Sequence, residues 1–156
     1  MHKLATSPDN VGGVARIVAI PVYSFTKVSF NYITRRRTLS LSSTDDCIEI
    51  ECNRNEEVSD NQNSNDEGIT YLHQLTGKIF SLDMVRNSYL DILSQGKWLL
   101  LVTTSNNITR LYGSPDTPLV FTYKDTSGKH KASSSVQYTF SSSQRRPALL
   151  IDNSPL

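Results

Sequence analysis

Four short apolar runs between residues 97 and 140 constrain the fold of this chain more than any other feature. Leucine, β-branched and aromatic residues fill the runs, and the segments 105–107, 113–118 and 126–129 separate them. These separators contain Asn, Gly or Pro, which reverse the chain because Asn and Gly tolerate positive φ and Pro lacks a backbone donor. The pattern predicts four successive antiparallel strands, and no catalytic motif lies on them.

Length, composition and charge indicate a single β-rich domain without a general attraction to nucleic acid. A chain of 156 residues is expected to form one domain, residues 1–156, that buries about two-thirds of its unfolded surface. Its hydrophobic content of 37% favours thin β layers with polar outer faces over a thick helical core. Sixteen basic and fifteen acidic residues leave a net charge of +1, so nucleic acid would need a local basic patch to bind.

Much of the remaining chain has the period of two that half-buried strands show. Such runs lie at residues 28–32, 38–42, 48–51 and 69–75. Residues 1–13 have no such pattern and are expected to form an extended arm.

The one predicted helix covers residues 82–94, where apolar residues recur mainly at spacings of three and four. This apolar stripe consists of Leu82, Val85, Tyr89, Ile92 and Leu93. The patterns together predict a mainly β fold, with two packed antiparallel sheets (a sandwich or a barrel) and one amphipathic helix.

Residues 53–68 interrupt the series of strands. They contain five acidic residues, several Asn and a single Val, so they have little apolar surface to bury and are predicted to form a long acidic, Asn-rich loop. Calcium binding through Asn61, Asn63 and Asn65 is an alternative use of this segment, although Asp66 stands where a calcium loop needs glycine.

Arg35, Arg36 and Arg37 form the strongest basic cluster, in a predicted turn between strands. Such a cluster is either solvated or contacts an acidic neighbouring subunit or a nucleic-acid backbone. We expect an oligomer interface in which the three arginines face the 53–68 loop of another copy. The acidic residues of that expected interface are Glu56, Glu57, Asp60, Asp66 and Glu67.

Catalytic and metal-binding patterns are missing from the sequence. His73 and His130 accompany no nucleophile motif, and zinc would need about four Cys or His ligands at short spacing. Cys47 and Cys52 are expected about 16 Å apart on opposite faces of a strand, beyond the roughly 7 Å reach of a disulfide. Both should therefore be free thiols. We predict a protein that is not an enzyme and holds no metal or cofactor.

The order of features from Leu82 to Phe140 resembles structural proteins of tailed-bacteriophage virions, in the tail-tube, tail-completion and neck-ring group. The resemblance lies in an amphipathic helix, Lys97-Trp98 at the head of an apolar strand, a turn at Asn106-Asn107, a Gly-Ser-Pro-Asp-Thr-Pro turn, and a closing strand. It covers a little over a third of the chain.

The resemblance implies a β-sandwich or barrel with one flanking helix, assembled as a homo-oligomeric ring around a DNA channel, without catalysis. The implied partners are further copies of the chain and other tail, neck or portal proteins, with non-specific proximity to DNA in the channel. The implied location is the virion, after synthesis in the host cytoplasm. No apolar run approaches the roughly 18 residues of a membrane span, so no membrane partner is expected.

Two other classes stay open at this stage. A monomeric β-sandwich that binds a sugar or a protein would need exposed aromatic side chains over a concave face, which Trp98, Tyr112 and Tyr123 would provide if they point outward. A small enzyme would need a site built around His73 or His130 with scattered carboxylates.

Overall fold

The computed structural model describes residues 13–53, 55–80, 84–125 and 135–152. Strands make up 61% of it, in three sheets, and the described residues contain one α-helix. The predicted mainly β fold with a single helix is confirmed, and the third sheet is additional to the two expected. The arm predicted at residues 1–13 lies outside the described residues, apart from Gly13.

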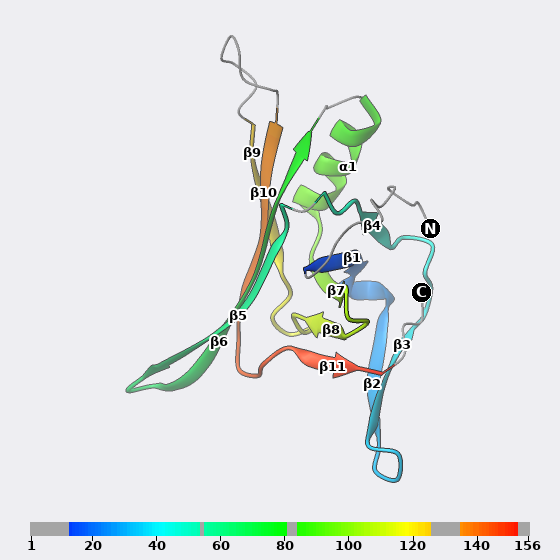
Figure 1. Cartoon of the computed structure of the whole chain (residues 1–156), viewed down its shortest axis with the longest axis vertical. Coiled ribbons are helices and arrows are strands. Elements are labelled where there is room, and N and C mark those ends of the chain that lie inside the picture. Colours follow the sequence, from blue (N-terminus) through cyan, green and yellow to red (C-terminus); the bar gives the residue numbers. More distant parts are fainter. Residues whose placement is uncertain (1–12, 54, 81–83, 126–134, 153–156) are drawn as a thin grey trace.

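The largest sheet has five antiparallel strands in the order β11-β8-β7-β1-β4 (Figure 1). These strands are β1 (Val14–Pro21), β4 (Ile48–Ile50), β7 (Trp98–Thr104), β8 (Thr109–Tyr112) and β11 (Leu149–Ile151). The central strands β1 and β7 are largely continuous apolar runs, because side chains on both of their faces are buried. β1 ends at Pro21, and a short 3₁₀ turn at Val22–Ser24 follows.

The second sheet has four antiparallel strands in the order β5-β6-β10-β9. These strands are β5 (Glu57–Asn65), β6 (Gly68–Phe80), β9 (Val120–Asp125) and β10 (Ser135–Gln144). Only one face is buried: Val136, Tyr138 and Phe140 point into the core, whereas Gln137 between them is exposed. In Figure 1, β6, β9 and β10 run along the long axis of the molecule and β7, β8 and β11 run across it, so the two sheets cross at a large angle.

The third sheet is a two-stranded hairpin of β2 (Phe25–Asn31) and β3 (Arg36–Leu41). Its base packs against the five-stranded sheet through Leu39, Phe25, Val28 and Leu41, and its far end projects from the body (Figure 1).

Two apolar clusters lie on opposite faces of the five-stranded sheet. One fills the space between this sheet, the four-stranded sheet and the helix, and the other lies beneath the β2–β3 hairpin. Cys47 belongs to the second cluster and Cys52 to the first, and both are free thiols. The prediction that the two cysteines lie on opposite faces and form no disulfide is therefore confirmed.

The helix α1 (Met84–Gln95) packs against the first cluster through Leu90 and Leu93. The predicted apolar stripe is only partly correct. Val85 is 63% exposed and Ile92 is 51% exposed, whereas Leu90, which was not in the stripe, is buried. Leu82 lies outside the described residues.

The strands expected between residues 97 and 140 form, but not as one meander. β7 and β8 belong to the five-stranded sheet, and β9 and β10 belong to the four-stranded sheet. The chain crosses between the sheets after Gly113, whose φ of 85° is a conformation that glycine adopts without strain. Leu119 ends the crossing by pairing with Trp98, through backbone hydrogen bonds of 3.1 and 2.8 Å.

The prediction of a loop over residues 53–68 is wrong. Residues 57–65 form β5, which pairs with β6 along its whole length, and a tight turn at Asp66-Glu67 joins the two strands. Backbone hydrogen bonds to β6 hold this polar strand in place, although it has little apolar surface to bury.

Candidate interaction surfaces

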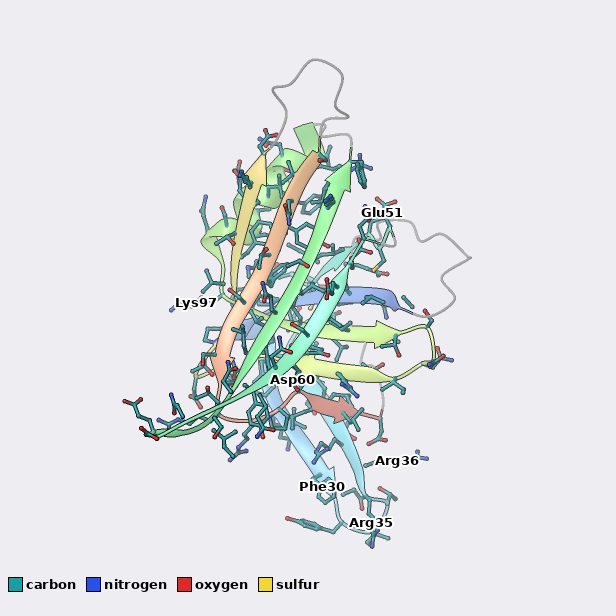
Figure 2. The ribbon with its side chains drawn as sticks, turned by 60° about the vertical axis from the view of Figure 1, so that its left-hand side comes forward. Phe30, Arg35, Arg36, Glu51, Asp60 and Lys97 are labelled. Atoms are coloured by element: carbon teal, nitrogen blue, oxygen red, sulfur yellow. The ribbon has the colours of Figure 1, made fainter. Side chains whose placement is uncertain are left out.

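The β2–β3 hairpin carries the basic cluster that the sequence identified. Arg35 lies in the turn, and Arg36 and Arg37 begin β3. Figure 2 shows Phe30, Arg35 and Arg36 at the far end of the hairpin, away from the two larger sheets. We refer to residues 31–36 as the hairpin tip.

Several contacts give the hairpin tip a defined shape. The side-chain oxygen of Asn31 accepts hydrogen bonds from the backbone nitrogens of Ile33 (2.9 Å) and Thr34 (3.1 Å), which closes the turn. Arg35 has a φ of 56°, in the left-handed region. The rings of Phe30 and Tyr32 meet edge to face, with centroids 5.0 Å apart.

The hairpin tip combines apolar side chains with positive charge. Tyr32 is 85% exposed and Ile33 is 94% exposed, and Arg35 and Arg36 beside them are exposed too. Arg37 is held closer to the body: its guanidinium lies 5.5 Å from the Phe30 ring centroid, and its backbone nitrogen donates to Asp152 at 2.6 Å. The sequence pattern predicted the arginine cluster correctly but placed Tyr32 in a half-buried strand. The exposure of Tyr32 could have been predicted from Ile33, an apolar residue that directly follows Tyr32 and breaks the period of two.

The acidic residues of the expected interface do not form one surface. Asp66 and Glu67 lie at the exposed turn of the β5–β6 hairpin, next to polar neighbours such as Asn63 and Asn65. Glu57 is exposed at the start of β5, while Glu56 accepts hydrogen bonds from the backbone of Asn53 at 3.0 Å.

Asp60 is half-buried: it lines the same hollow as Glu56 and Glu57, but its carboxylate oxygens contact groups inside the protein. One oxygen accepts a hydrogen bond from the backbone of Ala148 at 2.8 Å, and the other lies 3.4 Å from Nε2 of His73. Nδ1 of His73 in turn accepts a hydrogen bond from Gly113 at 3.0 Å. Burial lowers the pKa of His73, and the nearby Asp60 carboxylate opposes that effect in part. His73 and Asp60 together connect the crossing after β8 with the segment before β11.

A second acidic surface lies where α1 faces the connection between β3 and β4. We call it the acidic groove and define it by Tyr23, Asp45, Asp46, Val85 and Ile92. Its volume is about 360 Å³, and no Lys or Arg of the described chain lines it. Tyr23 is 73% exposed and hydrogen-bonds to Asp46. This surface was not predicted from the sequence, although two adjacent aspartates, Asp45 and Asp46, directly before Cys47 were a visible signal.

A smaller apolar pocket of about 220 Å³ lies on the other side of β4, against α1 and the end of β6. Ile50, Phe80, Leu90 and Leu93 contribute to its lining. Its charged residues are mixed in sign, because Arg86 lies 3.8 Å from Glu51 in the same lining.

The aromatic residues that a sugar-binding face would need are not assembled at the surface. Trp98 and Tyr112 are buried, and only Tyr123 is exposed. Trp98 packs at the end of α1, where its indole nitrogen donates to the carbonyl of Leu93 at 2.8 Å. The structure therefore contradicts the aromatic cluster proposed for a monomeric sugar-binding module.

The described residues contain no group of three or more His, Cys, Asp or Glu side chains that could hold a metal ion. Asn61, Asn63 and Asn65, which the calcium alternative required, are exposed on β5. Within the same part of the chain, no helix is both long and apolar enough to cross a bilayer.

Comparison of the chain with family models, with curated proteins and with solved structures gave no match.

Proposed function

We propose that this protein is a non-enzymatic structural subunit of a bacteriophage tail or neck, which assembles with copies of itself into a ring around the DNA channel. The observation that carries the proposal is the β2–β3 hairpin, which projects from the body and holds Tyr32 and Ile33 in solvent. Covering exposed apolar side chains with a partner removes them from water and lowers the free energy of the system. In an assembled subunit a neighbour can bury these two side chains, whereas in a monomer they stay exposed to water.

The sheet edges offer further contact surfaces. β4 and β11 end the five-stranded sheet, and β5 and β9 end the four-stranded sheet. Edge strands carry backbone groups that can pair with a strand of a neighbour. β5 is the longest of these edges, with nine residues. A ring needs two different surfaces that meet by rotation, and projecting hairpins together with open edges supply such surfaces.

The outer face of the four-stranded sheet suits the channel side of such a ring. Gln74, Thr76, Thr139 and Ser141 lie side by side on it, through the register of β6 and β10. Hydroxyl and amide groups cover much of this face, and Lys78 and Lys124 flank Gln137 on it. Two lysines contact few phosphates, so DNA can pass without being held tightly.

The phage assignment is supported by the resemblance of residues 82–140 to virion proteins. The corresponding elements are α1 followed by β7, β8, β9 and β10. The function is mechanical: contacts between subunits close the ring, the ring lines a channel, and other tail, neck or portal proteins dock on its ends.

Size-exclusion chromatography with light scattering, followed by electron microscopy, tests the proposal. We expect a closed oligomer whose subunit interfaces bury more than about 2,000 Å², as obligate interfaces do. Mass spectrometry of purified phage particles from the source should detect the protein. A monomer at tens of micromolar that is also missing from such particles would refute the proposed function.

A further inference from the structure

We propose that the hairpin tip of one copy docks into the acidic groove of a second copy. The inference rests on the proposed homo-oligomeric function and identifies the two surfaces that meet. It gives the assembly a direction, because a projection on one subunit enters a hollow on the next.

The chemistry of the two surfaces is complementary. The hairpin tip offers Tyr32 and Ile33 together with the positive charges of Arg35 and Arg36. The groove pairs an apolar floor with negative charge. Complementary charge steers two surfaces together and fixes their register, while the apolar side chains supply the buried area.

The apolar part of the acidic groove is open to solvent on an ordered helix. Val85 and Ile92 are one face of α1 and are more than half exposed, and Tyr23 stands opposite them on the 3₁₀ turn after β1. Asp45 and Asp46 are exposed beside these side chains. A basic and apolar tip covers all of these groups at once.

The other acidic surfaces fit the hairpin tip less well. The turn at Asp66 and Glu67 has no apolar side chain beside it other than the isolated Ile69. The hollow near Glu56 and Glu57 already contains the cation Arg110. The acidic groove therefore replaces the 53–68 segment as the expected partner of the arginines.

A hairpin tip cannot reach the groove of its own chain. Tyr23 lies just before the hairpin base, and the seven residues of β2 then extend about 23 Å away from it. In Figure 1 the hairpin tip is at the bottom of the molecule and α1 is at the top. The contact must join two copies, and since tip and groove are different surfaces, each copy can bind one neighbour on each side. Such a heterologous contact closes into a ring or continues as a filament.

A charge-swap experiment tests this contact. The double variant Arg35→Glu/Arg36→Glu and the double variant Asp45→Lys/Asp46→Lys should each raise the concentration for half-assembly by about a hundredfold, because like charges then meet. Mixing the two variants, or combining all four substitutions in one chain, should restore assembly. Asp66→Lys/Glu67→Lys is the matched control, with the same charge change on the other hairpin, and should assemble like the parent. All of these positions are exposed, so the melting temperature should change little.

Cross-linking locates the contact directly. A tagged Ile33→Cys chain mixed with an untagged Val85→Cys chain should form a disulfide under a mild oxidant, since both positions are exposed and the native cysteines are buried. A chain with Ile69→Cys in place of Ile33→Cys should not form this link.

The outcomes separate this inference from the proposed function. If the oligomer forms unchanged in both charge-reversed variants and no Ile33–Val85 link appears, the docking is wrong and the oligomeric function stands. If the parent protein stays monomeric at high concentration, the docking is wrong, and its absence from purified phage particles as well would refute the proposed function.

Discussion

The approach of Gly77 to Tyr138 gives the sharpest test of the packing in the four-stranded sheet. The two residues are direct partners across β6 and β10. A Cβ at position 77 would lie 2.4 Å from the Tyr138 hydroxyl oxygen and 2.5 Å from Cζ. Non-bonded carbon atoms are comfortable at about 3.5–4.0 Å, so the ring would have to move by roughly 1 Å.

The ring has little freedom to move by that amount. Tyr138 is 1% exposed and stacks with Phe121, with centroids 6.0 Å apart, and Phe140 lies edge-on at 6.2 Å. Overpacking of this kind costs about 1–3 kcal/mol. Replacing glycine by alanine in a strand returns roughly 0.5–1 kcal/mol. The middles of these two ranges leave a net cost, so we expect Gly77→Ala to lower the free energy of unfolding by about 1 kcal/mol.

Urea denaturation followed by Trp98 fluorescence and by circular dichroism measures this change. The same substitution made together with Tyr138→Phe is the control, because the hydroxyl oxygen is the nearest atom to the added methyl group. That hydroxyl has no hydrogen-bond partner among the described residues, so Tyr138→Phe alone should cost little. Gly77→Ala should then cost less in the Phe background. A Gly77→Ala protein as stable as the parent would show that the ring does not lie over this glycine.

Three further predictions concern buried polar and sulfur groups. Burial lowers the pKa of His73, so the folded state binds fewer protons than the unfolded state. The free energy of unfolding should therefore be highest above about pH 6.5 and decrease as the pH falls below that value. His73→Asn should remove this pH dependence in urea titrations between pH 5 and 8. Burial raises the pKa of Cys47, and burial with nearby carboxylates raises the pKa of Cys52 to about 12. Neither thiol should therefore react with a thiol reagent at pH 8 in the folded protein. Both should react, without reductant, once urea unfolds the chain. Trp98→Phe removes the hydrogen bond to the Leu93 carbonyl and part of a buried ring, so the unfolding free energy should fall by about 1–3 kcal/mol in the same urea assay, and an unchanged value would contradict the contact.

The sequence predicted the elements that bury one face or both. β7 and β10 were visible because an apolar run or a strict alternation marks a strand that packs against a core. β5 was not visible, since only Val58 packs against the core and the rest of its stability comes from backbone pairing with β6. Hydrogen bonds between backbones leave no mark on side-chain composition, so a polar edge strand resembles a loop.

The sequence located the arginines of the hairpin tip but not the acidic groove. The local sequence pattern is enough to place Arg35 in a turn. The burial of Asp60 depends instead on tertiary contacts, with His73 of β6 and with Ala148 before β11. The prediction of which face of α1 is buried was partly wrong for a similar reason. Helical periodicity identified an apolar stripe, but the position of α1 at the end of the two sheets decides that Leu90 is covered and Ile92 is not.

The strand order β11-β8-β7-β1-β4 also has a consequence for how the chain folds. The five-stranded sheet draws on segments from Val14 to Ile151, and β1 sits between partners that are far from it along the chain. Closing such long loops is slow, so folding times of milliseconds to seconds are typical for this topology. Until β7 joins β1, the base of the β2–β3 hairpin lacks the complete sheet against which it packs. If the proposed docking operates, only a subunit with the complete sheet would present both docking surfaces, so unfinished subunits would be kept out of the oligomer.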